Sequence, residues 1–411
     1  MKKTAAVTIC SINYMAKALV LFESYRLHHP GHPFYIVVVD RKIPDFTLDR
    51  TGLTLIWAED LPIKDFLQYA FTFDIIELNT NVKPTALKLL LAEYDTVLYL
   101  DPDIQIFSPL DVVFKALDSA SVVVTPHSNN PVLDGKKPDD LEFLRFGAFN
   151  LGFIGVSRCQ EANDFLDWWS ERCLKYGFYE PQLGLAVDQK WVNLALSYFP
   201  GLTVLRDAGL NVAFWNLHER RLSLENGQGM VNGTVPLKFI HFSSFDSSAP
   251  DNIAQKQNRF LPGSRPDFEP FAREYAKKLF AVESSKFVDN NYGFDYFDDG
   301  AYVAPALRRF YAALRVKGHF PMKNPFDPGG SVRAFAAKNG LVHKVGAVAK
   351  RQNFHDLGAY KKQIYLLLKM FRFVLFLLGP NRYFALMRYL AHISSLRNQV
   401  EMFGMATQEN P

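Results

Sequence analysis

The chain has 411 residues, of which 48% are hydrophobic and 21% are charged. This composition excludes a wholly disordered protein, and the length predicts two domains, because one core seldom grows beyond about 250–300 residues. The net charge of +4 is unevenly distributed: residues 301–411 hold 17 Lys and Arg against four Asp and Glu, whereas residues 1–300 hold 29 against 38. The basic tail therefore predicts an anionic partner, either nucleic acid or a membrane surface.

The first 110 residues alternate between strand and helix patterns. Apolar runs predict strands at 4–10, 34–40, 53–58 and 96–100, and helices are predicted at 14–28 and after Pro84. The run at 4–10 is too short for a signal-peptide core, so we interpret it as the first strand. This alternation predicts an α/β fold with a mostly parallel sheet, whose ligands bind at the carboxyl ends of the strands, where Asp40 and Asp101 fall.

The second half of the chain is more varied. Strands are predicted at 149–157, 202–207 and 237–242, and helices at 161–177 and 188–199, with Trp168 and Trp169 as core residues of the first helix. Residues 246–270 are rich in Ser, Pro, Asn and Asp, which predicts a domain boundary there. We therefore expect domains at 1–262 and 263–411, the second basic and mainly helical. Three cysteines (Cys10, Cys159 and Cys173) match no metal spacing, which argues against a disulfide framework and favours a reducing compartment.

The segment Asp101-Pro102-Asp103 follows an apolar strand directly. Two carboxylates at i and i+2 can face one hard cation and leave coordination positions for phosphate oxygens. The alternative is a strand-end turn, in which Asp bonds the local backbone. The position at the end of the predicted strand YDTVLYL favours the metal interpretation.

The segment YDTVLYLDPDIQIFSPL resembles the metal-binding segment of nucleotide-sugar glycosyltransferases with the GT-A fold, especially those of family 8. The resemblance covers about residues 4–262, and later segments are similar to bacterial polysaccharide glycosyltransferases. It implies a Rossmann-like GT-A domain that moves a hexose from a UDP-sugar to a cell-envelope glycan or lipid-linked acceptor, with retention. Its further elements, in the family's order, are Asn13-Tyr14, Lys88, FNLGFIGVS, Asp188-Gln189 and Ile240-His241-Phe242.

The resemblance also implies the roles of the central residues. His241 would join Asp101 and Asp103 as a ligand of Mn²⁺, with Mg²⁺ as the alternative, although a lone His on an apolar strand is often a core residue. Imidazole suits Mn²⁺ better than Mg²⁺. Asp188 and Gln189 would lie beneath the donor sugar as catalytic residues, while Asp188 could instead cap a helix. Front-face displacement and a covalent intermediate on Asp188 both stay open.

Further residues are assigned to the substrates by the resemblance. Ser244 stands where the family has Gly, and the family's Lys-Pro-Trp segment is absent, so Lys256 or Arg259 would replace its phosphate-contacting lysine. The residues assigned to the nucleotide sugar are Thr8, Asn13, Tyr14, Asp40, Lys88, Asn150, Gly152 and Lys256. Those assigned to the acceptor or sugar are Asn211, Trp215 and Asn216.

Several other functions compete with this assignment. An inverting transferase would need a carboxylate general base facing the acceptor. A nucleotidyltransferase would need a Gly-rich activating loop near the N-terminus, which the sequence lacks. A nucleic-acid-binding protein would explain the basic tail, but no such motif occurs, so we expect no nucleic-acid partner. A non-catalytic protein that binds a sugar or nucleotide is the remaining alternative.

Residues 360–378 form an apolar helical segment whose cations, Lys361, Lys362, Lys369 and Arg372, share one side. The segment lacks the roughly 20 uninterrupted apolar residues of a membrane-spanning helix. It is either a core helix with a solvated basic stripe or an interfacial helix lying on an anionic membrane. The second interpretation predicts a cytoplasmic protein that is peripheral on the inner face of the plasma membrane.

Overall fold

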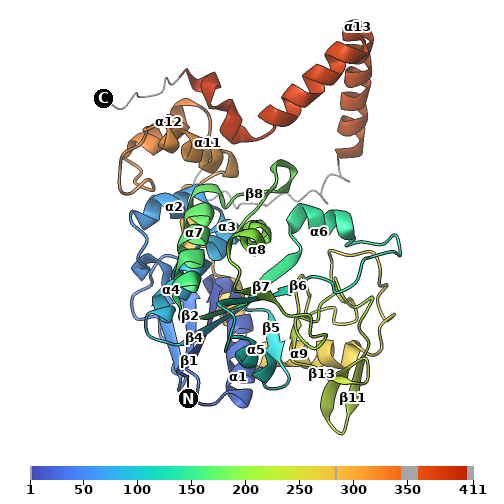
Figure 1. The fold of residues 1–411 in the computed structure, drawn as a ribbon. Helices are drawn as coiled ribbons and strands as arrows, with labels where there is room; N and C mark the ends of the chain where they lie inside the picture. The colour runs from blue at the N-terminus through green and yellow to red at the C-terminus, as the bar shows by residue number, and fades with distance from the viewer. Residues whose placement is uncertain (1, 283–284, 344–359, 405–411) are drawn as a thin grey trace. The chain divides into compact units, whose positions relative to one another are not determined.

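The computed structural model describes residues 2–282, 285–343 and 360–404 (Figure 1). The chain packs into two compact units. The first consists of Met1–Phe66 and Ile75–Gly293, and the second of Leu67–Asp74 and Phe294–Pro411.

A seven-stranded sheet forms the centre of the first unit within the described residues, in the order β10-β6-β7-β4-β1-β2-β3. Strand β7 runs antiparallel to its neighbours β4 and β6, and the other neighbouring pairs are parallel. The mostly parallel sheet predicted from the alternating pattern is therefore confirmed. The strands are β1 (Thr4–Cys10), β2 (Phe34–Val38), β3 (Leu53–Trp57), β4 (Thr96–Leu100), β6 (Val122–Pro126), β7 (Phe149–Ser157) and β10 (Leu202–Val204).

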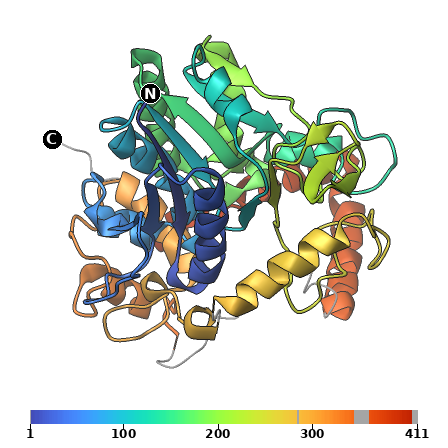
Figure 2. The ribbon, with the colours of Figure 1, turned by 90° about the horizontal axis from the view of Figure 1, so that it is seen from below.

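Helices cover both faces of this sheet, which explains why its strands are apolar on both sides. Leu98 and Leu100 of β4 pack in one core with Phe22 of α1 (Met15–His28), which lies alongside the strands in Figure 2. Tyr99 points to the opposite face, where it meets Lys83 of α4 (Lys83–Leu91). Successive side chains of a strand alternate between faces, so β4 connects two cores. Each buried Leu contributes about 1.5–3 kcal/mol, which makes this strand a firm support for the residues that follow it.

The short strands of the described residues form small sheets separate from the seven-stranded sheet. The strand β5 (Ile104–Ile106) follows the turn after β4 and pairs antiparallel with β14 (Phe239–His241). The other short strands are β8 (Tyr179–Glu180), β9 (Leu185–Ala186), β11 (Leu222–Glu225), β12 (Gln228–Val231) and β13 (Val235–Pro236). These strands pair in the orders β11-β12-β13 and β8-β9. The remaining α-helices of the first unit are α3 (Ile75–Asn81), α5 (Asp111–Ala116), α6 (Asp140–Phe146), α7 (Gln160–Tyr176), α8 (Val192–Tyr198) and α10 (Ser285–Val288). The helix α2 (Phe66–Thr72) falls in the second unit from Leu67 onward. In α7, Trp169 is fully buried as predicted, whereas Trp168 is partly exposed.

The helix α9 (Glu269–Ala281) belongs to the first unit, although it lies beyond the boundary predicted at residue 262. Its residues Phe271 and Tyr275 are buried in one core with Phe242 and Ile240. The polar stretch before it belongs to the same unit, and its residues 255–267 are exposed or half-buried. The amide of Gly263 donates to the carbonyl oxygen of Asp251 within this loop. The compact unit therefore ends at Gly293, since the apolar face of α9 has to be buried.

The second unit is mainly helical in its described part, as predicted. Its helices are α11 (Pro305–Val316), α12 (Ser331–Lys338), α13 (Lys361–Ile393) and the 3₁₀ helix η7 (Leu396–Phe403). Arg308 of α11 is buried and donates to the carbonyl oxygens of Ala70, Phe71 and Phe73 at 2.8–3.0 Å. It also pairs with Asp295 at 3.0 Å. These bonds join residues 67–74 to the helical unit.

Candidate functional site

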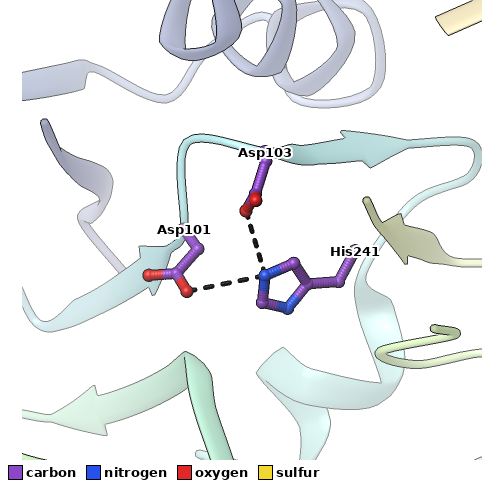
Figure 3. Close-up of side chains that lie close together, drawn as sticks. All are labelled: Asp101, Asp103 and His241. Atoms are coloured by element: carbon purple, nitrogen blue, oxygen red, sulfur yellow. Dashed lines mark ion pairs between the residues drawn. The ribbon is translucent and has the colours of Figure 1, made fainter. Parts of the chain in front are cut away.

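Two strand ends and one turn bring together Asp101, Asp103 and His241. Asp101 follows β4, and the turn that contains Asp103 leads into β5, where Ile104 lies opposite His241 of β14. The Nε2 atom of His241 lies 2.9 Å from Oδ1 of Asp103 and 3.5 Å from Oδ2 of Asp101 (Figure 3). The pairing of β14 with β5 therefore closes a three-residue cluster from residues 140 positions apart in sequence.

The three side chains offer donor atoms of the kinds that bind divalent cations in proteins. Two carboxylates and one imidazole offer ligand atoms that all lie within 4.8 Å of one another. Burial acts to lower the pKa of His241, but the neighbouring Asp103 carboxylate outweighs it, so that the pKa is raised. Burial acts to raise the pKa of Asp103, and the His241 imidazole reverses this effect. Mixed oxygen and imidazole ligands fit a divalent ion such as Mn²⁺.

Two asparagine side chains contact the second ring nitrogen of His241. The Nδ1 atom of His241 lies 3.2 Å from Oδ1 of Asn150 and 3.3 Å from Oδ1 of Asn211. Because amide oxygens only accept, Nδ1 carries the hydrogen, and Nε2 is directed at the carboxylates. The Asn211 backbone has a φ of 52°, a left-handed conformation that Asn tolerates better than most residues. Both asparagines therefore fix the ring orientation and the tautomer of His241, the imidazole candidate for metal binding.

Gly152 leaves the space that this cluster needs. Its carbonyl oxygen accepts the amide of Asp101 at 2.7 Å, so that β7 holds the end of β4. A Cβ atom at Gly152 would lie 2.4 Å from Cε1 of His241 and 2.8 Å from Oδ2 of Asp101. No side chain fits at these distances. The absence of a side chain at residue 152 is thus a requirement of the cluster itself.

Asp188 forms a buried ion pair with Lys83. The Nζ atom of Lys83 donates to Oδ2 of Asp188 at 2.6 Å and to the carbonyl oxygen of Leu151 at 2.8 Å. The two side chains are only 2% and 3% exposed. Burial raises the pKa of Asp188, and the Lys83 ammonium opposes the shift. The Asp188 carboxylate does not cap the helix that follows, so the alternative role considered for it is not observed.

A chain of contacts connects this ion pair to the three-residue cluster. The Nζ atom of Lys83 lies 4.3 Å from the centre of the Tyr99 ring, and the Tyr99 hydroxyl donates to Oδ1 of Asp101 at 2.5 Å. The Asp101 and Asp188 carboxylates also interact electrostatically. The catalytic and metal-ligand candidates therefore form one continuous polar site between β4 and α4.

Lys83 replaces Lys88 as the lysine of the site. Lys88 lies on an exposed side of α4 and pairs with Asp167, with side-chain exposures of 43% and 60%. Lys83 was missed from the sequence, although its spacing to Leu87 and Leu90 puts it on the apolar face of the helix. A lysine on that face is rarely buried without a carboxylate partner. That signal could have identified Lys83.

The two basic candidates near residue 256 do not reach the cluster. Lys256 is exposed and makes no ion pair with another described residue. Arg259 pairs with Asp134 at 2.5 Å and donates to the carbonyl oxygens of Lys136 and Pro138. Its guanidinium therefore holds the loop around residue 136. The prediction that Lys256 or Arg259 takes the place of the family's phosphate-contacting lysine stays without structural support.

Three residues assigned to the sugars or to catalysis are bonded or packed within the protein itself. The Asn216 amide is bound to the backbone of Ala213, His127 and Asn211, and the side chain is fully buried. Trp215 is 4% exposed, and its ring is perpendicular to His241 at 5.2 Å. These two residues are therefore packed behind the cluster and do not present a sugar-binding surface. In a similar way, the Gln189 amide bridges the backbone of Leu151 and Phe146.

The candidate residues near β1 and β2 differ in their burial and in their hydrogen bonds. Thr8 is fully buried in β1, and its hydroxyl has no hydrogen-bond partner among the described residues. Asn13 accepts from the Ser11 hydroxyl at 2.6 Å, and Tyr14 is 44% exposed. Asp40, which follows β2, accepts from the amides of Arg41 and Gly293. Their assignment to the nucleotide sugar stays a prediction.

Tyr275 is a further residue that the sequence did not indicate. Its ring stacks on Phe242 with centres 4.0 Å apart, and its buried hydroxyl has no hydrogen-bond partner among the described residues. Burial raises the pKa of Tyr275, and the charges of the Asp103 carboxylate and Tyr14 raise it further. Tyr275 lies on α9, outside the domain predicted to hold the site, and no local pattern pointed to it.

Comparison with known proteins gives weak similarities. No family model matches the chain. It is 25% identical over 259 residues to the uncharacterised Bacillus subtilis protein YfnF, covering 61% of this chain and 85% of YfnF. It is also 25% identical over 245 residues to YfnD of the same organism, covering 58% and 76%.

Among solved structures, the chain is similar to the galactosyltransferase LgtC in complex with donor and acceptor sugar analogues, with 16% identity, a TM-score of 0.39 and coverage of 67% and 95%. It is also similar to the glycosyltransferase GlyE of Streptococcus pneumoniae TIGR4, with 16% identity, a TM-score of 0.41 and coverage of 72% and 67%. Likeness at this level does not assign the chain to a family, so its function has to be argued from the site.

Proposed function

We propose that the protein is a metal-dependent GT-A glycosyltransferase, related to family 8, that transfers a hexose from a UDP-sugar to a cell-envelope glycan or lipid-linked acceptor. The convergence of Asp101, Asp103 and His241 carries this proposal. A D-x-D turn alone is common, but a buried imidazole 2.9 Å from its second carboxylate adds the third ligand that the sequence resemblance implies. The three free cysteines accord with a reducing, cytoplasmic location.

The cluster would hold Mn²⁺, or Mg²⁺ as the alternative, and the bound ion would neutralise charge on the departing nucleoside diphosphate. The protein's own groups prepare the ligands for this task. The Tyr99 hydroxyl orients the carboxylate of Asp101, while Asn150 and Asn211 fix the tautomer of His241. Such pre-orientation avoids reorganisation during the reaction.

Asp188 is the catalytic candidate for the sugar itself. Its carboxylate is negatively charged when paired with Lys83, and a carboxylate near the anomeric carbon stabilises an oxocarbenium-like state or attacks it directly. Front-face displacement through the oxocarbenium-like state retains the configuration, and so does a covalent intermediate on Asp188 that the acceptor hydroxyl then displaces. Gln189 acts indirectly in this proposal, because its amide is bound to the backbone on both sides and holds β7 against α6.

A panel of nucleotide sugars tests the proposal. With Mn²⁺ and a glycan or lipid-linked acceptor, we expect release of nucleoside diphosphate from a UDP-hexose and no release after chelation. The measurement is a coupled assay of the released diphosphate. Saturable binding of a nucleotide sugar without turnover would instead identify a binding protein, and turnover that is unaffected by chelation would contradict the metal role.

Stereochemistry provides a separate prediction. Because the resemblance at Asp188-Gln189 and His241 implies retention, we expect a UDP-α-sugar to yield an α-linked product. The coupling constant of the new anomeric proton in NMR distinguishes the two outcomes. A β-linked product would contradict retention and would require a general base that faces the acceptor.

A further inference from the structure

The helix α13 is the longest helix of the described chain, with 33 residues, and none of its residues over Lys361–Ile393 is buried. It consists of two limbs that meet at Gly379, whose φ of 71° and ψ of 168° are not helical and which precedes Pro380. Figure 1 shows the two limbs meeting at an angle. Among the described residues, this is the one helix that is long and apolar enough to cross a membrane by length and composition.

The bend between the limbs is strongly apolar and exposed. We call residues 373–380 the hairpin tip; they contain no charged side chain and lie between Arg372 and Arg382. Phe376 is 83% exposed, Leu377 is 63% exposed and Phe373 is 60% exposed. Contiguous exposed apolar side chains of this size mark an interaction surface.

The charges around the hairpin tip indicate the partner. The helix α13 carries six Lys and Arg residues and no Asp or Glu. Each cation near an anionic bilayer surface adds favourable attraction, which an apolar protein partner would not supply. Arg372 and Arg382 flank the tip on the two limbs. A bilayer offers both kinds of contact: its lipid tails can take up the apolar tip, and its anionic headgroups attract the two arginines beside the tip.

The geometry distinguishes tip insertion from the other membrane arrangements. A spanning helix needs about 20 apolar residues, whereas the first limb contains Lys369 and Arg372 and ends at the break after Leu378. A helix lying flat keeps a charged or polar face along its whole length, whereas residues 373–380 carry no charged side chain. From Arg372 to Gly379 the helix rises about 10 Å, which matches the roughly 5–10 Å to which interfacial helices enter a bilayer.

We propose that the hairpin tip inserts into one leaflet of an anionic membrane, with Arg372 and Arg382 at the level of the phosphates. This attachment revises the flat interfacial helix predicted from the sequence. The chain returns from the hairpin into the second unit, because Phe403 of η7 packs against Phe310 and Phe335 at 4.8 and 5.0 Å. The hairpin is therefore anchored at its end, and residues 396–403 have to be kept intact in any test.

Vesicle binding tests the inference with two matched double variants of the full chain. The tip variant is Phe376→Glu with Leu377→Glu, and the limb variant is Leu366→Glu with Leu367→Glu, all at exposed positions. The probes are phosphatidylcholine vesicles with and without one quarter phosphatidylglycerol, and binding is measured by co-sedimentation. We expect wild-type binding only to the anionic vesicles. The tip variant should bind at least about 100-fold more weakly, since two apolar side chains no longer enter the bilayer, and the limb variant should bind within about tenfold of wild type.

Each other outcome overturns the inference. Equal loss in both variants would indicate a flat or spanning helix, and wild-type protein that ignores anionic vesicles at low salt would exclude lipid as the partner. Light scattering that shows a dimer in the wild type and a monomer in the tip variant would identify a second copy of this chain as the occupant. Thermal unfolding of both variants provides the folding control. Because binding is measured without substrate, this result does not depend on the proposed transferase activity.

Discussion

Asp103→Asn is expected to remove Mn²⁺ binding and to reduce sugar transfer by about 100-fold or more. A bound cation stabilises the charge of the leaving group by several kcal/mol, and each ~1.4 kcal/mol corresponds to a factor of ten in rate. The substitution removes one charged ligand and keeps the side-chain shape, so the His241 contact loses its carboxylate without creating a cavity. Calorimetric titration with Mn²⁺ measures the binding directly, and the diphosphate-release assay measures the rate.

The matched control for this prediction is Asp118→Asn. Asp118 pairs with Lys2 on the surface, with side-chain exposures of 66% and 49%, and such pairs contribute about 0–1 kcal/mol. We expect this variant to bind Mn²⁺ like wild type. Treatment of the wild type with a chelator should reproduce the Asp103→Asn phenotype, and added Mn²⁺ should reverse it. If Asp103→Asn binds Mn²⁺ with unchanged affinity, the assigned cluster is wrong.

Lys83→Met should destabilise the first unit by about 3–5 kcal/mol, the cost of leaving a buried charge without its partner. Met fills most of the volume of the lysine stem but offers no ammonium to Asp188, whose side chain is 3% exposed. The carbonyl oxygen of Leu151 also loses its donor. Urea unfolding measures the change in free energy. Transfer activity should fall as well, because the Asp188 carboxylate is no longer held in place.

Two further variants show whether the ion pair carries this effect. Lys88→Met alters an exposed pair on the same helix and should change the free energy of unfolding by about 1 kcal/mol or less. The double variant Lys83→Met with Asp188→Asn removes both charges and should recover part of the lost stability, but not the activity. Equal destabilisation by Lys83→Met and Lys88→Met would show that the buried pair is energetically unimportant.

The sequence by itself determined the local elements and the central motif. Strand β4 and the helix α1 were predicted from apolar periodicity, because a covered sheet and its helices need that pattern wherever they occur. Asp101 and Asp103 were identified because they follow β4 directly in the chain. His241 and Asp188 were added by resemblance of short segments to a known family. Each of these inferences depends on neighbouring residues or on a short motif.

The tertiary structure decided which side chains meet across long stretches of sequence. Lys83 and Lys88 are five positions apart on one helix, yet only the first is buried against Asp188, 105 residues later. The amide of Asn216 could form hydrogen bonds with a sugar, but its oxygen and its nitrogen are both already bonded to the backbone of neighbouring residues. Tyr275 is buried against Phe242 because the apolar face of α9 had to be covered. Local patterns report which face of an element is apolar, whereas the partner of a polar group depends on the elements packed against that face.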